Sequence, residues 1–409
     1  MTPLDSLVRE RITDGLKMLD GVRVLDLTSS IAGPYGTQLL ADLGASVTKI
    51  EKVEGGDDTR GWGPPFLDGA SLWYLSVNRN KESVTLDIQR PEGRAILDEL
   101  IGSSDVFVVN LVQRAQQRLG IDAGQLRAKH PHLIHVSLTG FGLSGAHADL
   151  PCYDLIAEGY SGIMDLTGEA HGGPQKVGTP AADLLAGQDL ALATLAALYE
   201  RKSTGRGRSV DVSMVASAVR FMAPRIVPFM GSGQRVTRSG GRDSVLAVYQ
   251  VFDTADEPIT LGLGNDAIWR RFWSAVGRDG YGNSDAYASN EKRREAREQI
   301  VEVIAHMLRT QPRAHWLALF AEHRIPAGPI NRIDQVIDDP CLQDRNMFYA
   351  VEGARGWVPQ VGLGIRFDGK GGVHRRAPPT LGEDTERVLR QRLGMSEACV
   401  AGLKDAGIV

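Results

Sequence analysis

Short apolar runs alternate with helix-like segments along the first third of the chain. The strand-like runs cover 22–27, 46–51, 83–87, 106–110 and 133–137. Helical segments lie between them; the clearest are 34–43, which begins with a proline and ends at Gly44, and 91–101. This alternation predicts an α/β fold with a doubly wound, Rossmann-like parallel sheet. Ligand-binding loops are then expected beyond the carboxyl ends of the strands.

A second region of strands and helices begins near Gly231. Strand-like runs at 246–254 and 259–263 precede helical segments at 267–276, 291–309 and 313–322, and 324–329 is expected to be the return connection. Helices at 383–393 and 397–406 would rejoin the first domain. Because the 409 residues exceed the roughly 250–300 at which one core stops growing, two domains are expected.

These patterns predict four parts of the chain. Residues 1–20 are predicted to form a short amphipathic N-terminal extension, because apolar residues recur there at near-helical spacing, namely Leu4, Val8, Ile12, Leu16 and Met18. Residues 21–225 form the N-terminal part of a large domain. A second, smaller α/β domain follows at 226–330, and 331–409 return to the large domain.

Composition narrows the function. The net charge of −4 argues against nucleic acid as a partner, although local basic groups can still bind small anionic ligands. Three distant cysteines fit neither a disulfide framework nor a metal site, and they suit a reducing compartment. Neither a signal peptide nor a run of about 18 apolar residues is found, so a cytoplasmic protein without membrane contact is expected.

Asp183 is the main candidate for chemistry. It precedes an apolar, alanine-rich helix expected at 184–200, followed by Gly205 and Gly207. Its carboxylate has two interpretations from spacing alone. It can cap the helix, a role worth about 1 kcal/mol, or it can be a nucleophile beside free N–H groups that stabilise an oxyanion. Spacing favours the cap and does not exclude the nucleophile.

The first strand-to-helix turn argues against a dehydrogenase. It reads Thr28-Ser29-Ser30-Ile31-Ala32-Gly33-Pro34 and lacks the G-x-G-x-x-G spacing that lets backbone approach a pyrophosphate. The fold is therefore expected to serve a ligand other than a dinucleotide.

From about Leu19 to Val409 the sequence resembles the family III CoA transferases, also called the CaiB/BaiF type. This group contains formyl-CoA transferase, carnitine CoA-transferase and the α-methylacyl-CoA racemases. Each motif is weak alone, but the order and spacing are specific. The motifs are Ile31-Ala32-Gly33-Pro34, Leu43-Gly44-Ala45, Lys49-Ile50-Glu51, Asp57-Asp58-Thr59-Arg60-Gly61-Trp62, Asn80-Lys81-Glu82-Ser83, Asn110, Arg118-Leu119-Gly120, Tyr153-Asp154, Lys202-Ser203-Thr204-Gly205-Arg206-Gly207 and Ala327-Gly328-Pro329.

The resemblance implies a CoA transferase with Asp183 as nucleophile. In the family's proposed course this carboxylate attacks an acyl-CoA to give an aspartyl–acyl anhydride and CoA thiolate. An aspartyl-CoA thioester then leads to the new acyl-CoA. The implied substrates are acyl-CoA and small carboxylic acids, with no metal and no permanently bound cofactor. The family also implies a homodimer of two interlocked ring-like chains.

Other positions carry over from the same motifs. The implied CoA-binding residues are Lys52, Leu86, Asn110, Leu111, Arg118 and Leu119. The residues implied to line the acyl end are Ile31, Tyr153, Asp154, Gly240 and Gly241.

Two departures from formyl-CoA transferase affect the expected substrate. Ile31 stands where that enzyme has glutamine, and the glycine-rich loop is shorter, with Gly240 and Gly241 as its remnant. Because isoleucine cannot donate a hydrogen bond, a formyl or oxalyl group is not favoured, and a larger or less polar acyl group is.

Two alternatives stay open. A racemase needs two acid/base groups, and the family supplies a histidine where this chain has Tyr153, whose ordinary pKa near 10 makes it a poor base at neutral pH. His147 lies nearby and is interpreted as a loop residue. A non-catalytic CoA-binding homologue is the other alternative, because capping alone could retain Asp183.

Overall fold

The computed structural model describes residues 3–10, 13, 15–371 and 374–409. The chain forms two compact units, each described by itself. The first comprises Met1–Ile163, Val177–Pro224 and Asp339–Val409, and the second comprises Met164–Lys176 and Arg225–Asp338. The second unit thus takes in 164–176, which the sequence assigned to the large domain. A backbone hydrogen bond from Gly240 N to Gly168 O (3.0 Å) joins this segment to the rest of the second unit.

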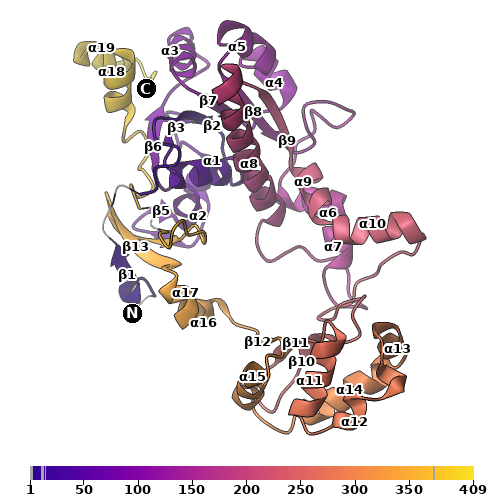
Figure 1. The fold of residues 1–409 in the computed structure, drawn as a ribbon. Coiled ribbons are helices and arrows are strands. Elements are labelled where there is room, and N and C mark those ends of the chain that lie inside the picture. Colours follow the sequence, from indigo (N-terminus) through magenta and orange to yellow (C-terminus); the bar gives the residue numbers. More distant parts are fainter. Residues whose placement is uncertain (1–2, 11–12, 14, 372–373) are drawn as a thin grey trace. The chain divides into compact units, whose positions relative to one another are not determined.

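A parallel sheet of six strands forms the core of the first unit (Figure 1). Its strands are β2 (Arg23–Leu27), β3 (Ser46–Glu51), β6 (Lys81–Thr85), β7 (Val106–Val109), β8 (Ile134–Thr139) and β9 (Ser209–Ser213). The order is β6-β3-β2-β7-β8-β9, with every pair parallel. The predicted doubly wound sheet is confirmed. The sequence pattern missed β9, whose alternating Ser209–Ser213 is only partly buried.

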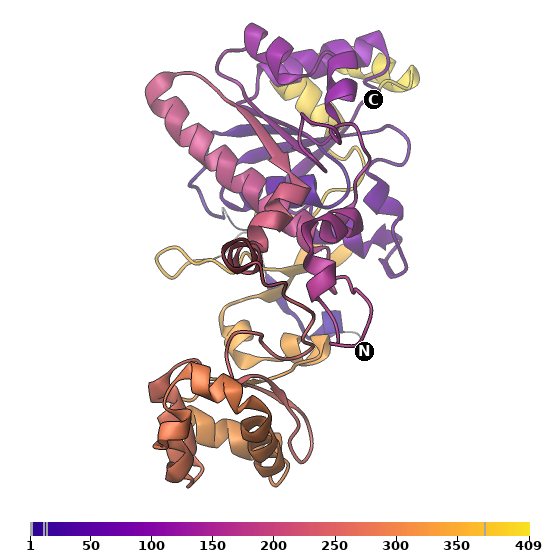
Figure 2. The same cartoon turned by 90° about the vertical axis from the view of Figure 1, so that its right-hand side faces the viewer.

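Helices cover both faces of this sheet. Those of the first unit are α1 (Ala32–Asp42), α2 (Leu72–Ser76), α3 (Pro91–Gly102), α4 (Gln113–Arg118), α5 (Ala123–Lys129), α6 (Asp154–Ser161), α8 (Ala181–Thr204), α9 (Met214–Phe221), α17 (Pro340–Asp344), α18 (Thr385–Leu393) and α19 (Glu397–Asp405). One buried cluster joins α3, α5, α18 and α19 to the strands. The helices α1 and α8 pack together, and Figure 2 shows α8 running beside the sheet.

The first unit also contains short elements at its edges. They are η1 (Pro3–Ser6), η2 (Asp58–Gly61), the hairpin of β4 (Phe66–Leu67) and β5 (Ala70–Ser71), and a sheet of β1 (Val8–Glu10), β13 (Phe348–Gly353) and β14 (Gly356–Val361). Within the N-terminal extension, the near-helical spacing of apolar residues does not give a helix at Val8, which pairs in parallel with Tyr349 of β13. Of the residues behind that prediction, Ile12 lies outside the described residues.

The second unit packs helices against a small antiparallel sheet. Its elements are β10 (Tyr249–Phe252), β11 (Ile259–Gly262), β12 (Ala327–Pro329), α11 (Asp266–Ala275), α12 (Asp279–Gly282), η3 (Asp285–Tyr287), α13 (Asn290–Glu295), α14 (Arg297–Leu308), α15 (Arg313–Glu322) and α16 (Ile333–Ile337). The segment expected as a return connection contains β12, which pairs with β11. The helices α7 (Ile163–Leu166) and α10 (Ala223–Ser232) lie where the chain passes between units.

Candidate active site

The strand order reverses between β2 and β7, and the turns after these two strands are joined there. Asn110, which follows β7, accepts a hydrogen bond from Ser29 N (3.2 Å) and donates one to Ser29 O (2.9 Å). In open α/β sheets the crevice beyond such a reversal is the usual ligand site. Ser29 and Asn110 therefore mark the expected place for a ligand in the first unit.

Asp183 lies in the first turn of α8 and is not its cap. The helix begins at Ala181 after Pro180, so Asp183 is its third residue. The exposed N–H groups at this end are bound by another helix: Asp154 Oδ1 of α6 accepts from Ala182 N (2.8 Å) and from Asp183 N (3.3 Å). The capping role that spacing favoured for Asp183 is therefore filled by Asp154.

Close backbone packing places this end of α8. A Cβ on Gly36 of α1 would lie 2.7 Å from Gly187 O, and a Cβ on Gly187 would lie 2.7 Å from Ala32 O. Glycine at both positions lets the two helices approach closely. Asp183 lies one turn before this contact, so its distance from the β2–α1 turn depends on it.

The Asp183 carboxyl has an unusual pKa. Burial, followed by the negative charges of Asp154 and Glu158, raises the pKa of Asp183 to about 7. Its side chain is only 9% exposed, and Glu158 is fully buried, with its carboxylate accepting from Val177 N (3.0 Å). Strongly perturbed carboxyls in a pocket are frequent at catalytic positions. Near neutral pH this group is available both as a carboxylate and as an acid.

Asp183 opens into a cavity of about 340 Å³, called here the Asp183 pocket. Its lining combines apolar side chains with hydroxyl and amide groups from the turns after β2, β7 and β8. The lining residues are Ser29, Ser30, Ala32, Asp58, Asn110, Leu111, Val112, Ala115, Leu138, Thr139, Gly140, Leu150, Pro151, Cys152, Tyr153, Asp183 and Met214.

A larger cavity of about 730 Å³, called here the Lys52 pocket, adjoins the Asp183 pocket at the turn that follows β2. All six residues carried over as CoA-binding line it: Lys52, Leu86, Asn110, Leu111, Arg118 and Leu119. Four residues line both pockets, namely Ser29, Asn110, Leu111 and Ala115. The two pockets are therefore neighbours across the Ser29–Asn110 junction.

Lys52 lines the Lys52 pocket and forms an ion pair with Asp58, which lines the Asp183 pocket. Its Nζ is 2.7 Å from Asp58 Oδ1, and both side chains are largely exposed, at 67% and 55%. An exposed pair of this kind contributes little stability. Lys52 can therefore exchange Asp58 for an anionic ligand at small cost.

The residues carried over for the acyl end divide into three groups. Tyr153 lines the Asp183 pocket, and Asp154 caps α8 beside it. Ile31 is buried and is not among the lining residues of the Asp183 pocket. Gly240 and Gly241 line a cavity of about 610 Å³ within the second unit.

Sequence reasoning missed Glu158 and Ser30. Glu158 lies four residues after Asp154, so both project from one face of α6, a spacing that could have revealed it. Ser30 has a φ of 69°, which sequence does not reveal because serine rarely adopts it. Glu158 affects the Asp183 pocket through its charge, and Ser30 forms part of the lining of that pocket.

The histidine that the family's racemases pair with aspartate has no counterpart among the lining residues of the Asp183 pocket. They include no histidine, and His147 packs edge-to-face against Phe141 and Tyr160. Within the described residues no group of three or more His, Cys, Asp and Glu is arranged to hold a metal ion. Among the carboxyls that line the pocket, Asp183 is the one whose pKa is raised toward neutrality.

Comparison with known proteins agrees with this chemistry. Residues 19–385 match the model of the protein family described as CoA-transferase family III. The chain is 34% identical to succinate–glutarate CoA-transferase of Agrobacterium fabrum, covering 91% of this chain and 95% of that protein. It is 32% identical to human succinyl-CoA:glutarate CoA-transferase, with coverage of 97% and 91%. A solved CaiB/BaiF family protein from Brucella suis superposes with a TM-score of 0.80 at 32% identity, covering 91% of this chain and 99% of that one. The chain therefore belongs to CoA-transferase family III and is an enzyme with CoA-transferase activity.

Proposed function

We propose that Asp183 is the nucleophile that carries CoA between two carboxylic acids. The observation that carries this proposal is its freedom from the capping role, since Asp154 binds the N–H groups of the helix end. Asp183 instead lines a pocket that adjoins the cavity of the carried-over CoA residues.

In the first half of the proposed course, the Asp183 carboxylate attacks the thioester carbonyl of the donor. The carbon–sulfur bond breaks, CoA leaves as thiolate, and an aspartyl–acyl anhydride remains. The thiolate then attacks the aspartyl carbonyl, which releases the donor acid and forms an aspartyl-CoA thioester. The acceptor carboxylate then attacks the aspartyl-CoA thioester, which releases CoA thiolate and gives an anhydride between Asp183 and the acceptor. The thiolate attacks the acceptor carbonyl of this anhydride, so the new acyl-CoA leaves and the Asp183 carboxylate is regenerated.

The perturbed pKa of Asp183 suits this course. A carboxylate needs no base to act as a nucleophile, and the pKa raised to about 7 makes it more basic than an ordinary aspartate. Burial also limits water, which would hydrolyse the anhydride. The first turn of α8 adds the positive end of a helix dipole to the same place.

For CoA itself, Lys52 and Arg118 are proposed to bind phosphate groups, with Leu86, Leu111 and Leu119 along the less polar parts of the ligand. All five line the Lys52 pocket. For the acids, we propose small dicarboxylic acids of four or five carbons, because two relatives are named for succinate or succinyl-CoA and glutarate. The first pair to test is succinyl-CoA and glutarate.

The test is covalent trapping. The protein is incubated with succinyl-CoA and hydroxylamine, and the modified peptide is located by mass spectrometry. A hydroxamate at Asp183 is expected, together with loss of CoA exchange in Asp183→Ala. Modification of a different residue, or normal exchange in Asp183→Ala, would remove the proposed mechanism.

We also propose a homodimer. Large apolar side chains stay exposed on three helices of the first unit: Leu155, Ile156 and Tyr160 on α6, Leu192 and Tyr199 on α8, and Phe221 on α9. Within the described part of the chain, α8 has the length and apolar character of a membrane span, but 50% of that window is buried. Exposed apolar patches mark contact surfaces, and a second copy is the occupant implied by the family resemblance. Light scattering during gel filtration measures the mass directly.

A further inference from the structure

The turn from Thr28 to Ser30 separates the two pockets of the site. Ser29 lines both cavities and Ser30 lines the Asp183 pocket, so a displacement of this turn changes both at once. Ser30 adopts a φ of 69°, in the left-handed region that a non-glycine residue rarely occupies. Such a conformation persists only where surrounding contacts enforce it.

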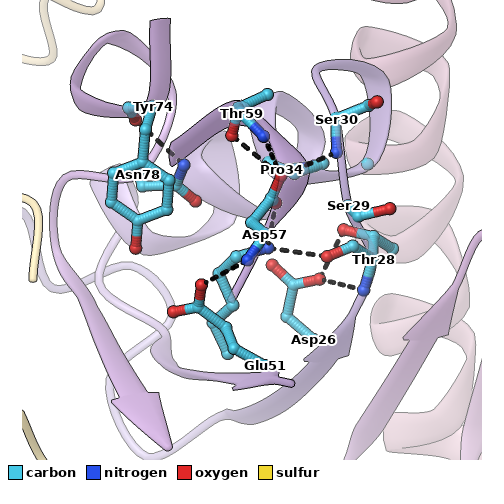
Figure 3. A network of polar contacts seen from close by, with 12 residues as sticks. Asp26, Thr28, Ser29, Ser30, Pro34, Glu51, Asp57, Thr59, Tyr74 and Asn78 are labelled. Atoms are coloured by element: carbon cyan, nitrogen blue, oxygen red, sulfur yellow. Dashed lines mark hydrogen bonds and ion pairs between the residues drawn. The ribbon is translucent and has the colours of Figure 1, made fainter. Parts of the chain in front are cut away.

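Side chains hold every backbone polar group from Thr28 N to Ser30 N. Asp26 accepts from Thr28 N (2.9 Å), and Lys49 Nζ donates to Thr28 O (2.6 Å). Asn110 binds Ser29 N and Ser29 O. Asp57 Oδ1 accepts from Ser30 N (3.2 Å), as Figure 3 shows. A turn normally leaves such groups to water or to local backbone. Here they are fixed from four separate segments of the sequence.

Behind the turn these side chains form a compact set of opposite charges. Lys49 Nζ lies 2.8 Å from Asp57 Oδ2, and Lys81 Nζ lies 3.2 Å from Asp26 Oδ2, with all four side chains at most 1% exposed. Glu51 continues the set by accepting from Asp57 N (3.0 Å), as Figure 3 shows. Burial, opposed by the neighbouring cations, leaves the pKa of Asp26 and of Asp57 below the usual range.

Stability does not account for these buried charges. A buried ion pair is often matched or exceeded in stability by apolar residues of similar volume, because desolvation offsets the attraction. The pairs do, however, impose directions that apolar residues cannot impose. Lys49 binds Thr28 O and Asp57 binds Ser30 N, so one ion pair holds both ends of the turn.

We infer that Lys49 and Asp57 are positioning residues for acyl-CoA, and that their ion pair holds the Thr28–Ser30 turn in the shape that joins the Lys52 pocket to the Asp183 pocket. This inference rests on the proposed function of those pockets. It also assigns a role to Lys49 and Asp57 within the Lys49-Ile50-Glu51 and Asp57-Asp58-Thr59 motifs, since both residues line the Lys52 pocket.

The test uses the full chain and removes both charges together, so that neither is left buried alone. In Lys49→Met with Asp57→Asn, the amide still offers an acceptor to Ser30 N, but Thr28 O loses its donor. The matched control is Arg79→Met with Asp42→Asn. That pair is equally buried at 2.6 Å and lies at the other end of α1, away from the turn.

Melting temperature, CoA affinity by calorimetry and kcat/KM are measured for both double variants. We expect the Lys49 and Asp57 variant to stay folded, with kcat/KM lower by about tenfold or more because reacting groups are misplaced. The control should keep CoA affinity and kcat/KM within about twofold, whatever stability it loses. Equal losses of affinity in the two variants, or an unchanged kcat/KM in the first, would overturn the inference.

A pair of single variants at Ser30 supplies a second readout. Glycine adopts a φ of 69° without strain, so Ser30→Gly should melt at or above the wild-type temperature while CoA affinity and kcat/KM fall. Ser30→Ala removes the hydroxyl from the lining of the Asp183 pocket but keeps the constraint on φ, so its losses of affinity and kcat/KM should be smaller than those of Ser30→Gly. If Ser30→Gly is fully active, the rigidity of the turn is not used.

Wild-type calorimetry with CoA alone separates this inference from the proposed function. If the wild type binds CoA and the variants bind and react equally well, only the positioning role is lost. If the wild type does not bind CoA, the assignment of the Lys52 pocket fails, and the inference built on it fails as well.

Discussion

The carboxylate of Asp154 caps the helix that carries Asp183. Asp154 Oδ1 accepts from Ala182 N at 2.8 Å and from Asp183 N at 3.3 Å. Its charge also contributes, after burial, to the raised pKa of Asp183. One residue thus acts on Asp183 in two ways, through the hydrogen bonds of the cap and through its negative charge.

Two substitutions separate these contributions. Asp154→Ala removes the cap and should lower the free energy of unfolding by about 1 kcal/mol. Asp154→Asn keeps an oxygen acceptor and removes only the charge, so the pKa of Asp183 should fall and the acid limb of the rate profile should move to lower pH by about 0.5 to 1 unit. An acid limb in Asp154→Asn identical to that of the wild type would show that the charge has no influence.

The rate should depend on the ionisation of Asp183. Because its pKa is raised to about 7, the carboxylate is lost as the pH falls below neutrality. The rate is expected to fall about tenfold per pH unit below 7 and to level off above it, measured as kcat/KM in constant ionic strength. If kcat/KM stayed unchanged as the pH was lowered to 5, an essential carboxylate with this pKa would be contradicted.

The stability of the folded protein should fall as the pH rises, whereas the rate should increase. The folded-state pKa of Asp183 lies above the ordinary value of 3.8, so the folded protein holds its proton longer than the unfolded chain does. Rising pH between about 4 and 7 therefore costs stability. Asp183→Asn removes this cost and should be more stable than wild type above pH 7, by about 1 to 3 kcal/mol, and equal to it below pH 4. Urea denaturation at several pH values measures the difference.

The glycine contact between α1 and α8 should matter for both stability and rate. A methyl group at Gly187 would meet Ala32 O at 2.7 Å, so Gly187→Ala must push the helices apart. A loss of about 1 to 3 kcal/mol is expected, with a lower kcat because Asp183 moves. Gly402→Ala in α19 is the matched control, since its Cβ meets nothing within 4 Å and alanine favours the helix. Equal effects in the two variants would exclude a special role for the contact.

Lys52 should contribute to CoA affinity through phosphate groups. Lys52→Ala is expected to raise the Kd for CoA by about tenfold at low salt, and by less at high salt. Asp58→Asn releases Lys52 from its 2.7 Å pair and should tighten binding slightly. The loss in Lys52→Ala should disappear with an acyl-pantetheine donor, which lacks the nucleotide phosphates. A loss of the same size with that donor would place Lys52 elsewhere.

Much of the fold followed from local patterns. The strands at 46–51 and the helices at 91–101 and 313–322 were predicted to within a residue or two of their observed bounds, because apolar runs and proline starts act within a few residues. The strands β1 and β12 were not predicted. Val8 and Ala327 are in strands because distant segments offer them backbone partners, and no local pattern records that.

The site divides in the same way. The sequence by itself determined the family, the nucleophile candidate and six of the residues that line the Lys52 pocket, since these rest on ordered motifs. Only the tertiary structure decided that Asp154 and not Asp183 caps α8, because capping depends on which carboxylate reaches the helix end in space. The raised pKa of Asp183 likewise depends on the tertiary structure. It needs burial together with two carboxylates from another helix, and packing sets that arrangement.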